Sequence, residues 1–292
     1  TKKALAVKTD CNGRYVYLNP RRGAQIAVAE SARNVSCTGA VPVAITNCLN
    51  FGNPYDPEVY WQFSEAIAGM REACVALETP VTGGNVSFYN ESPDASVLPT
   101  PVIGMLGVHE DADLATASVF RHPDDQIVLL GVERGELGGS EYLFQRTGSI
   151  VGDAPLMDLD LEKKLQAFCR ELGSERLIES AHDCSEGGLA VSVAECLFGL
   201  GCNLGATVTC PEPGLSRDRS LFGETQSRML VSVKPENLER VIEKAGKRGI
   251  PAVPIGKVDS SGKLRVDGVI EISVSELELA YEAAIPKAMG EK

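Results

Sequence analysis

Ten residues, Thr82–Glu91 with the sequence TGGNVSFYNE, combine a bare backbone with small polar side chains. Glycine has no Cβ, so Gly83 and Gly84 allow the backbone to approach a phosphate or to adopt a positive φ. Asn85 and Ser87 alternate along an extended segment and share one face, where an amide oxygen suits a hard cation and a hydroxyl suits a substrate. A tight turn after a strand explains the glycine pair equally well, so the segment alone leaves both interpretations open.

A second polar segment, Ile45–Pro54 with the sequence ITNCLNFGNP, ends the preceding strand-like run. Ligands gather at strand ends in layered α/β folds. The alternative is a loop whose Asn, Gly and Pro residues cap backbone groups. Two such segments at the ends of neighbouring strands favour a binding site over two unrelated loops.

A third candidate is spread along the chain as Asp10, Glu30, Asn34, Asp183 and Ser185. Carboxylates and an amide oxygen are suitable ligands for Mg²⁺, which usually keeps substrate phosphates in its coordination shell. Glu30 and Asn34 lie four residues apart on one predicted helix face, where simple solvation is the alternative. Ser185 precedes a helix and could be only its N-cap. The combination, rather than any single member, indicates a metal site.

Other motifs are weaker. The sequence has no HExxH, GxSxG, GxxxxGK[ST] or GxGxxG, so zincin, serine hydrolase, P-loop and Rossmann functions have no motif support. The glycine-rich segment 135–143 could cradle a phosphate or allow close helix packing. For His182 and Cys184, a structural role is favoured over catalysis.

Strand and helix patterns alternate along the chain, which indicates an α/β to α+β protein. Strands are expected at 4–10, 40–49, 80–88, 101–109, 127–132, 177–183, 203–209, 227–233 and 252–258. Helices are expected at 21–36, 58–77, 137–147, 160–172, 186–198, 235–249 and 273–285. The acidic and Pro-containing stretch near 110–122 predicts two domains, 1–112 and 113–292. Because the chain opens directly on a strand, the first domain is expected to lack its start.

Composition narrows the class of partner. The chain has 292 residues, a formal net charge of −12, and 43% hydrophobic residues. The acidity and the scattered basic residues argue against nucleic acid as a partner. No apolar run is long enough to span a membrane and no signal-peptide core is present, so no membrane partner and a cytoplasmic location are expected. Nine cysteines without a CxxC pair are expected to stay reduced.

Six segments together carry a family resemblance. In order, they are KTDCNGRYVYLNP, ITNCLNFGNP, TGGNVSFYNE, GELGGSEYL, HDCSEGGLA and FGETQSRMLVSV. With these, the whole chain resembles the phosphoribosylformylglycinamidine synthases in their small bacterial form, within the aminoimidazole ribonucleotide synthetase superfamily. That family joins an N-terminal α/β domain to a C-terminal α+β three-layer domain and repeats the unit in tandem. This chain is similar to the second unit, the C-terminal half.

The resemblance implies a ligase of purine biosynthesis. The family converts formylglycinamide ribonucleotide, ATP and glutamine-derived ammonia to formylglycinamidine ribonucleotide, ADP and phosphate, with Mg²⁺ as cofactor. The implied partners are the N-terminal half of the synthase, a glutaminase subunit and a small accessory subunit. The fragment is expected to be inactive alone. Two alternatives remain: a non-catalytic nucleotide-binding scaffold half, and another ATP-using synthetase of the superfamily.

The resemblance also assigns residues. Asn47 and Gly84 match ATP-binding positions, Asn85 a metal position and Ser87 a substrate position. The family usually has Asp where this chain has Asn47, so a charge-based role there is absent.

A second set of residues matches the auxiliary nucleotide site of the large form of the enzyme, which holds ADP and Mg²⁺. The set is Asp10, Glu30, Asn34, Asp183 and Ser185. The family's catalytic residues belong to the first unit, so no catalytic residue is expected here. Glu224 and Gln226 echo a substrate-binding segment of that first unit.

Overall fold

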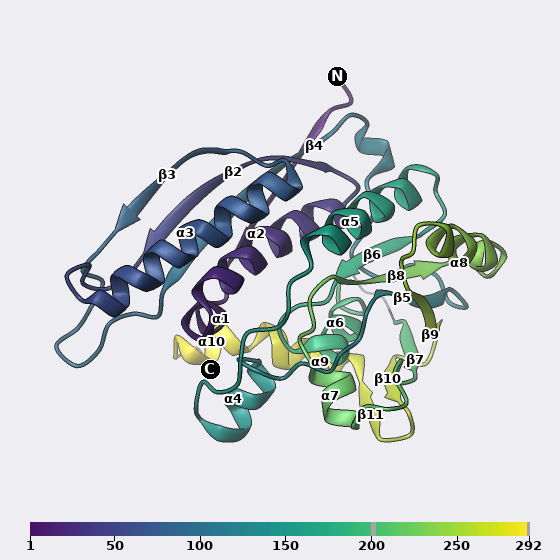
Figure 1. Cartoon of the computed structure of the whole chain (residues 1–292). Coiled ribbons are helices and arrows are strands. Elements are labelled where there is room, and N and C mark those ends of the chain that lie inside the picture. The colour runs from purple at the N-terminus through teal and green to yellow at the C-terminus, as the bar shows by residue number, and fades with distance from the viewer. Residues whose placement is uncertain (200–202, 291–292) are drawn as a thin grey trace.

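The chain forms two layered units, each built on its own sheet (Figure 1). A computed structural model describes residues 1–199 and 203–290. The first unit covers residues 4–109 and the second residues 126–288. The predicted α/β and α+β layers are confirmed, whereas the boundary at residue 112 stays a prediction. None of the described helices is both long and apolar enough to cross a membrane.

The first unit is a four-stranded sheet covered by helices on one face. Its strand order is β1-β4-β2-β3, with β2 and β3 parallel and the other pairs antiparallel. The strands are β1 (Ala4–Asp10), β2 (Val41–Asn50), β3 (Val81–Ser87) and β4 (Thr100–His109). The helices are α1 (Gly13–Leu18), α2 (Pro20–Cys37) and α3 (Pro57–Leu77). A short 3₁₀ helix, η1 (Ala112–Leu114), follows β4.

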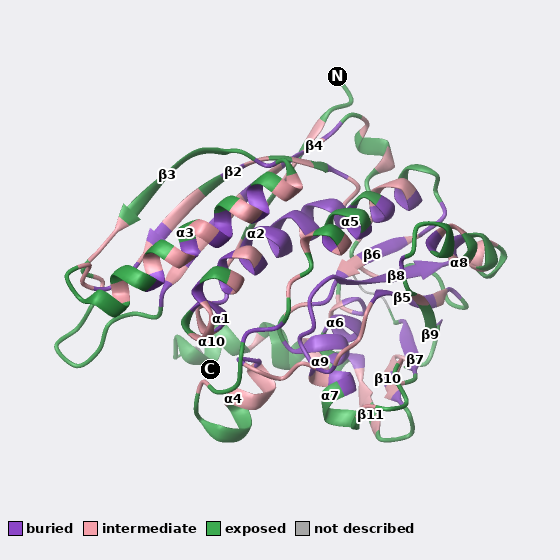
Figure 2. Ribbon diagram, viewed as in Figure 1, coloured by how far each residue is buried: buried purple, intermediate pink, exposed green. Residues whose placement is uncertain are grey.

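Helix α2 is the most buried element of the first unit (Figure 2). Asn19 caps it by accepting from the N–H of Arg22, and Pro20 stands at its first position, where a missing N–H costs nothing. Ala24, Ala27 and Val28, which lie three and four residues apart on the face toward the core, are at most 2% exposed. Ala and small polar residues elsewhere on α2 allow α3, α5 and β6 to pack around it, so this helix lies between the two units.

The second unit is a seven-stranded sheet with helices on both faces. Its order is β11-β10-β7-β9-β5-β8-β6; among the described strands, β10 and β7 pair in parallel and the other neighbours are antiparallel. The strands are β5 (Gln126–Gly131), β6 (Ser180–Asp183), β7 (Gly205–Val208), β8 (Arg228–Val233), β9 (Ala252–Asp259), β10 (Lys263–Val266) and β11 (Ile270–Ser273). The helices are α4 (Glu141–Thr147), α5 (Leu159–Ser174), α6 (Gly188–Glu195), α7 (Arg217–Phe222), α8 (Leu238–Lys247), α9 (Val274–Glu282) and α10 (Ala284–Ala288), with a 3₁₀ turn η2 (Pro235–Asn237).

Alternation along β5 shows how this sheet is sandwiched. Ile127 and Leu129 belong to the core cluster beneath α6, whereas Val128 and Leu130 belong to the cluster beneath α5 and α8. Successive side chains of a strand point to opposite faces, so an apolar run of this kind is buried on both. The second unit is therefore the predicted three-layer domain.

Several boundaries differ from the sequence-based expectation. The predicted strand 177–183 is shorter, because only Ser180–Asp183 pairs with β8. The predicted helix 137–147 begins at Glu141, since the N-cap side chain of Ser140 accepts from the N–H of Leu143. Helices α1, α7 and α10 and strands β10 and β11 were not predicted, because each is at most six residues long and carries little periodicity.

Candidate functional site

The side-chain amide of Asn34 gathers three segments that are far apart in the sequence. Its Nδ2 atom donates to Oδ2 of Asp183 at 3.1 Å, to the carbonyl oxygen of Glu30 at 3.1 Å, and to Oδ2 of Asp10 at 3.4 Å. Asp10 ends β1, Asp183 ends β6, and Asn34 lies in the last two turns of α2. The structure thus brings four of the five predicted auxiliary-site residues together, with contributions from both units.

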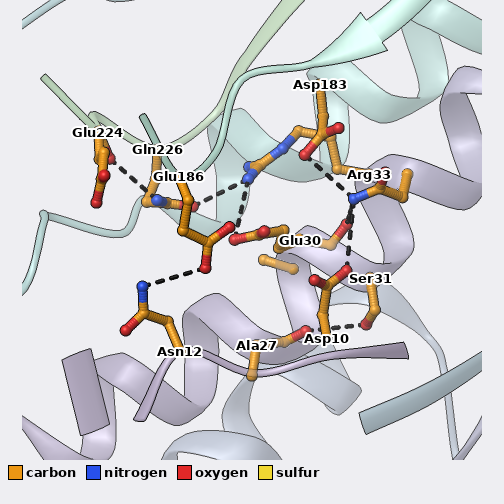
Figure 3. A network of polar contacts seen from close by, with 12 residues as sticks. Asp10, Asn12, Ala27, Glu30, Ser31, Arg33, Asp183, Glu186, Glu224 and Gln226 are labelled. Carbon is orange, nitrogen blue, oxygen red and sulfur yellow. Dashed lines mark hydrogen bonds and ion pairs between the residues drawn. The ribbon is translucent and has the colours of Figure 1, made fainter. Parts of the chain in front are cut away.

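Glu186 adds a fourth carboxylate that the sequence did not single out. Its Oε1 atom accepts from Nδ2 of Asn12 at 3.1 Å. Figure 3 shows its side chain directed toward that of Glu30. We call Asp10, Glu30, Asn34, Asp183 and Glu186 the Asn34 cluster.

The fifth predicted residue, Ser185, stands apart. Within the described residues, its side chain makes no hydrogen bond to the other four. The alternative role as an N-cap is wrong, because Gly187 occupies the N-cap position of α6 without a side-chain bond. The solvated alternative for Glu30 is also wrong, since that residue is only 4% exposed.

The cluster carries more negative charge than its surroundings neutralise. Burial raises the pKa of Asp10 to about 7, with Lys8 opposing the rise and Asp183 and Glu186 adding to it. Burial and the neighbouring carboxylates of Glu186 and Asp10 likewise hold the pKa of Glu30 well above its usual value. Crowded carboxylates in a low-dielectric site favour protonation or a bound cation.

Two basic residues compensate part of this charge. Nζ of Lys8 lies 4.0 Å from Asp10, and the guanidinium of Arg33 lies 3.9 Å from Glu30. Burial alone would lower the pKa of Lys8, but the carboxylates of the cluster raise it. The donor set is entirely oxygen and therefore fits Mg²⁺ chemically. Across residues 1–199 and 203–290, however, no three His, Cys, Asp or Glu side chains are placed to hold a metal by themselves.

Arg33 connects the cluster to the interface between the units. It is completely buried and donates through Nη1 to Glu162 of α5 at 2.9 Å and through Nη2 to Gln226 at 3.0 Å. Glu162 also accepts from Ser227 at 2.6 Å and from Gln166 at 2.9 Å. Paired carboxylate and amide oxygens offset the cost of burying this charge, so these contacts fix α2 against the second unit. Figure 3 shows the part of the network that joins Arg33 to Gln226.

Glu224 forms a second buried link between the units. Its Oε1 atom accepts from the backbone N–H groups of Gly187 at 2.8 Å and Glu141 at 2.9 Å, and its Oε2 atom accepts from the hydroxyl of Tyr15. These donors belong to the starts of α6 and α4 and to α1. The N–H at the start of α4 is therefore already used by a protein carboxylate.

The glycine-rich segment before α4 is closely packed, in line with one of its two alternatives. A Cβ on Gly138 would lie 2.0 Å from the carbonyl oxygen of Asp153. Cys184 is likewise structural, because it is fully buried and burial raises its pKa to about 11. At neutral pH, this thiol is not ionised and is a poor nucleophile.

The other predicted site lies on β2 and β3, separated from β1 by β4. Asn47 pairs with Gly84 in the ladder and directs its Nδ2 atom toward Met70 of α3 at 3.3 Å. A Cβ at Gly84, whose φ is +151°, would lie 2.0 Å from Oδ1 of Asn47. Gly84 is therefore required by its neighbour in the adjacent strand.

Asn85 and Ser87 share a face, as predicted. Nδ2 of Asn85 donates to Oγ of Ser87 at 3.1 Å, and both residues pair with β2 through Cys48 and Asn50. By strand alternation, this face is opposite to that of Asn47. The four predicted ATP, metal and substrate residues therefore neighbour one another along the backbone, but their side chains do not form one cluster.

Comparisons with known proteins agree with the two-unit architecture. The family described as "AIR synthase related protein, N-terminal domain" matches residues 1–109, and the corresponding C-terminal domain matches residues 122–269. The phosphoribosylformylglycinamidine synthase subunit PurL of Chlorobaculum tepidum is 48% identical over 301 aligned residues, covering 99% of this chain and 40% of that protein. The chain thus spans about 40% of the length of the relatives it matches.

Solved structures show the same fold. The structure of T. maritima PurL complexed with FGAR matches with a TM-score of 0.80 and 24% identity, covering 94% of this chain and 46% of that one. The same protein complexed with ADP matches with a TM-score of 0.74 and 25% identity, over 94% of this chain and 44% of that one.

Proposed function

The chain belongs to the AIR synthase related proteins, and from this membership we propose that it is the second half of a phosphoribosylformylglycinamidine synthase. The proposed reaction forms formylglycinamidine ribonucleotide, ADP and phosphate from formylglycinamide ribonucleotide, ATP and glutamine-derived ammonia. The observation that carries the proposal is the 48% identity to a PurL subunit over 99% of this chain.

The uncovered face of the first sheet supports the N-terminal half as a partner. Leu5 and Val7 of β1 are 69% and 71% exposed, and Val41 and Val43 of β2 are 51% and 37% exposed. In the ladder, Leu5 and Val41 both pair with Val108 of β4, so these apolar groups adjoin. A contiguous apolar patch of this kind marks a protein interface. A glutaminase and a small accessory subunit complete the proposed assembly.

Within this assembly, Asn47 and Gly84 are the proposed ATP contacts, Asn85 the Mg²⁺ contact and Ser87 the substrate contact. Mg²⁺, when bound, neutralises charge on phosphate groups. The side chains of Asn85 and Ser87 are mutually hydrogen-bonded and open to the exterior, so a ligand can reach them without disturbing the core. Asn47 holds no charge, and its amide can contribute only hydrogen bonds.

The Asn34 cluster is the proposed auxiliary site for a nucleoside diphosphate and Mg²⁺. Mg²⁺ is commonly bound by one or two carboxylates together with phosphate oxygens, so Asp10, Glu30 and Asp183 do not need to surround it alone. The Nδ2 atom of Asn34 donates to the carboxylates of Asp10 and Asp183. Its Oδ1 atom is the one suited to bind a cation. Ser185, in the turn before α6, remains a proposed member of this auxiliary site.

Reconstitution tests the proposed activity. This chain alone is expected to give no turnover with formylglycinamide ribonucleotide, ATP, Mg²⁺ and ammonium, whereas co-expression with an N-terminal half is expected to give product. Turnover by the isolated chain would contradict the half-enzyme proposal. Activity of the pair with a different acceptor only would favour another synthetase of the superfamily.

A scaffold function is the second candidate, and the position of the Asn34 cluster favours it. The cluster takes Asp10, Glu30 and Asn34 from one unit and Asp183 from the other, and Arg33 links it to the buried interface. A nucleotide bound there would stabilise the pair of units without taking part in turnover.

A further inference from the structure

A polar pocket of about 300 Å³ lies at the end of β6 opposite to the Asn34 cluster. It is lined by residues from the segment after β4, the turn between α5 and β6, and the end of β8. The polar residues among them are Asp113, Thr116, Arg121, Arg176, Glu179 and Lys234. Glu179 immediately precedes β6, whereas Asp183 ends it, so the two sites are at opposite ends of a strand about 10 Å long.

The acidic groups of this pocket already have cationic partners. Oδ2 of Asp113 lies 2.5 Å from Nζ of Lys2. Oε1 of Glu179 lies 3.2 Å from Nζ of Lys234, and its Oε2 lies 3.4 Å from Nε2 of His122. Little negative charge is therefore left to attract the remaining cations of the pocket.

Arg121 and Arg176 are those remaining cations. Among the residues that the structure describes, neither guanidinium has a carboxylate within ion-pair distance or a side-chain hydrogen bond. Both side chains are exposed and line the same concave surface. Each presents a planar set of donors that matches the oxygens of a phosphate.

The backbone of Arg176 is strained. Arg176 has φ +54° and occupies the left-handed position that ends α5, with its N–H donating to Gly173 and the N–H of Leu177 donating to Leu172. Glycine is the usual residue at this position because it has no Cβ penalty. A glycine at this position would therefore relieve the backbone strain without disturbing the turn.

We propose that this pocket binds a small phosphomonoester, with Arg121 and Arg176 on the phosphate. The hydroxyl of Thr116 and the carboxylate of Glu179 supply acceptors for hydroxyl groups on the rest of the ligand. The volume lies at the lower end of the range for small-molecule sites, which fits a compound the size of a pentose phosphate. The site is separate from both nucleotide sites proposed above and does not depend on them.

Calorimetric titration of the 292-residue chain with ribose 5-phosphate tests the proposal, with ribose as the ligand that lacks phosphate. Ribose 5-phosphate is expected to bind and ribose is not. Arg121→Gln and Arg176→Gln are each expected to weaken binding about tenfold or more, because each removes a charge-assisted contact. Arg71→Gln, at an exposed arginine of α3 outside the pocket, is the matched control and should leave the affinity unchanged.

Arg176→Gly separates binding from folding. Glycine relieves the positive φ, so this variant is expected to keep or raise the melting temperature while losing affinity to the same extent as Arg176→Gln. The proposal is overturned if ribose 5-phosphate does not bind, if ribose binds equally well, or if Arg71→Gln weakens binding as much as the pocket variants do.

Discussion

Nδ2 of Asn34 lies 3.1 Å from Oδ2 of Asp183, and this hydrogen bond joins helix α2 of the first unit to strand β6 of the second. The contact spans 149 residues of sequence and has Asp10 and Glu30 beside it. The proposed auxiliary site therefore takes residues from both units. Ligand binding at this site and the stability of the interface between the units are expected to change together.

The first prediction concerns nucleotide binding at the Asn34 cluster. The chain is expected to bind ADP in a Mg²⁺-dependent manner, and Asp183→Asn is expected to weaken binding about tenfold or more, because one charged contact is worth roughly 1.5–3 kcal/mol. Isothermal titration with and without Mg²⁺ measures both effects. Asp160→Asn, at an exposed position of α5, is the control. Equal affinity of the wild-type and Asp183→Asn chains would remove Asp183 from the site.

The second prediction concerns pH. The folded-state pKa of Asp10 is about 7 against an ordinary value of 3.8, so the folded chain binds more protons than the unfolded chain between these values. The stabilising contribution of Asp10 is therefore complete below its ordinary pKa of 3.8. It is lost as the pH rises through the folded-state pKa of about 7. The free energy of unfolding in the absence of Mg²⁺ is expected to fall over this range.

Asp10→Asn isolates this contribution from that of Asp125, whose pKa burial also raises, to about 6. The variant removes the titrating group while keeping its shape, so its urea midpoint should fall less with pH, with a gain of roughly 1–3 kcal/mol at the alkaline end. Parallel pH profiles for the two chains would show that Asp10 ionises normally in the fold.

The third prediction uses the two adjacent glycines of β3. A Cβ at Gly84 would collide with Asn47, and its φ is strained for other residues, so Gly84→Ala is expected to destabilise the chain by about 1–3 kcal/mol. A Cβ at Gly83 would meet no other atom within 4 Å, so Gly83→Ala should be nearly neutral. Denaturant unfolding of the two variants gives the comparison. Similar midpoints would mean that the close approach of Gly84 and Asn47 is not maintained in solution.

The fourth prediction concerns the buried ion pair. Arg33→Met leaves the carboxylate of Glu162 buried without its guanidinium and is expected to cost about 3–5 kcal/mol. Adding Glu162→Gln removes the stranded charge, so the double variant should be more stable than the sum of the two single effects. A double-mutant cycle from urea unfolding measures the coupling, and strict additivity would argue against a direct pair.

The fifth prediction separates a catalytic half from a scaffold half. Asn85 is exposed and its side chain bonds only to Ser87 among the described residues, so Asn85→Ala should change stability by less than about 0.5 kcal/mol. In the reconstituted enzyme, the same substitution is expected to reduce the rate strongly if Asn85 contacts Mg²⁺. An unchanged rate would favour the scaffold function.

Local pattern was sufficient to predict most of the fold. The apolar spacing of α2 and the apolar run of β5 each specify an element without reference to distant residues. Some of the shortest elements, such as β10 and α7, were missed because four to six residues with mixed polarity present too few side chains for a period to be recognised.

The sequence was less informative about the network around the candidate site. Asp10, Asn34 and Asp183 were grouped by the chemistry of their side chains and by family resemblance, because no spacing in the sequence places them together. The contacts of Arg33 with Glu162 and of Tyr15 with Glu224 span 129 and 209 residues, and no local motif indicates them. A buried charge is specified by its partners in space, which only the folded chain reveals.

The burial of α2 determines how the two units unfold. This helix belongs to the first unit by sequence, yet it packs against α5 and β6 of the second. Unfolding of either unit would expose the surface that the other buries against α2. The two units should therefore unfold as a single cooperative block in hydrogen exchange. The slowest-exchanging amides are expected in α2, with protection limited by the global unfolding of both units.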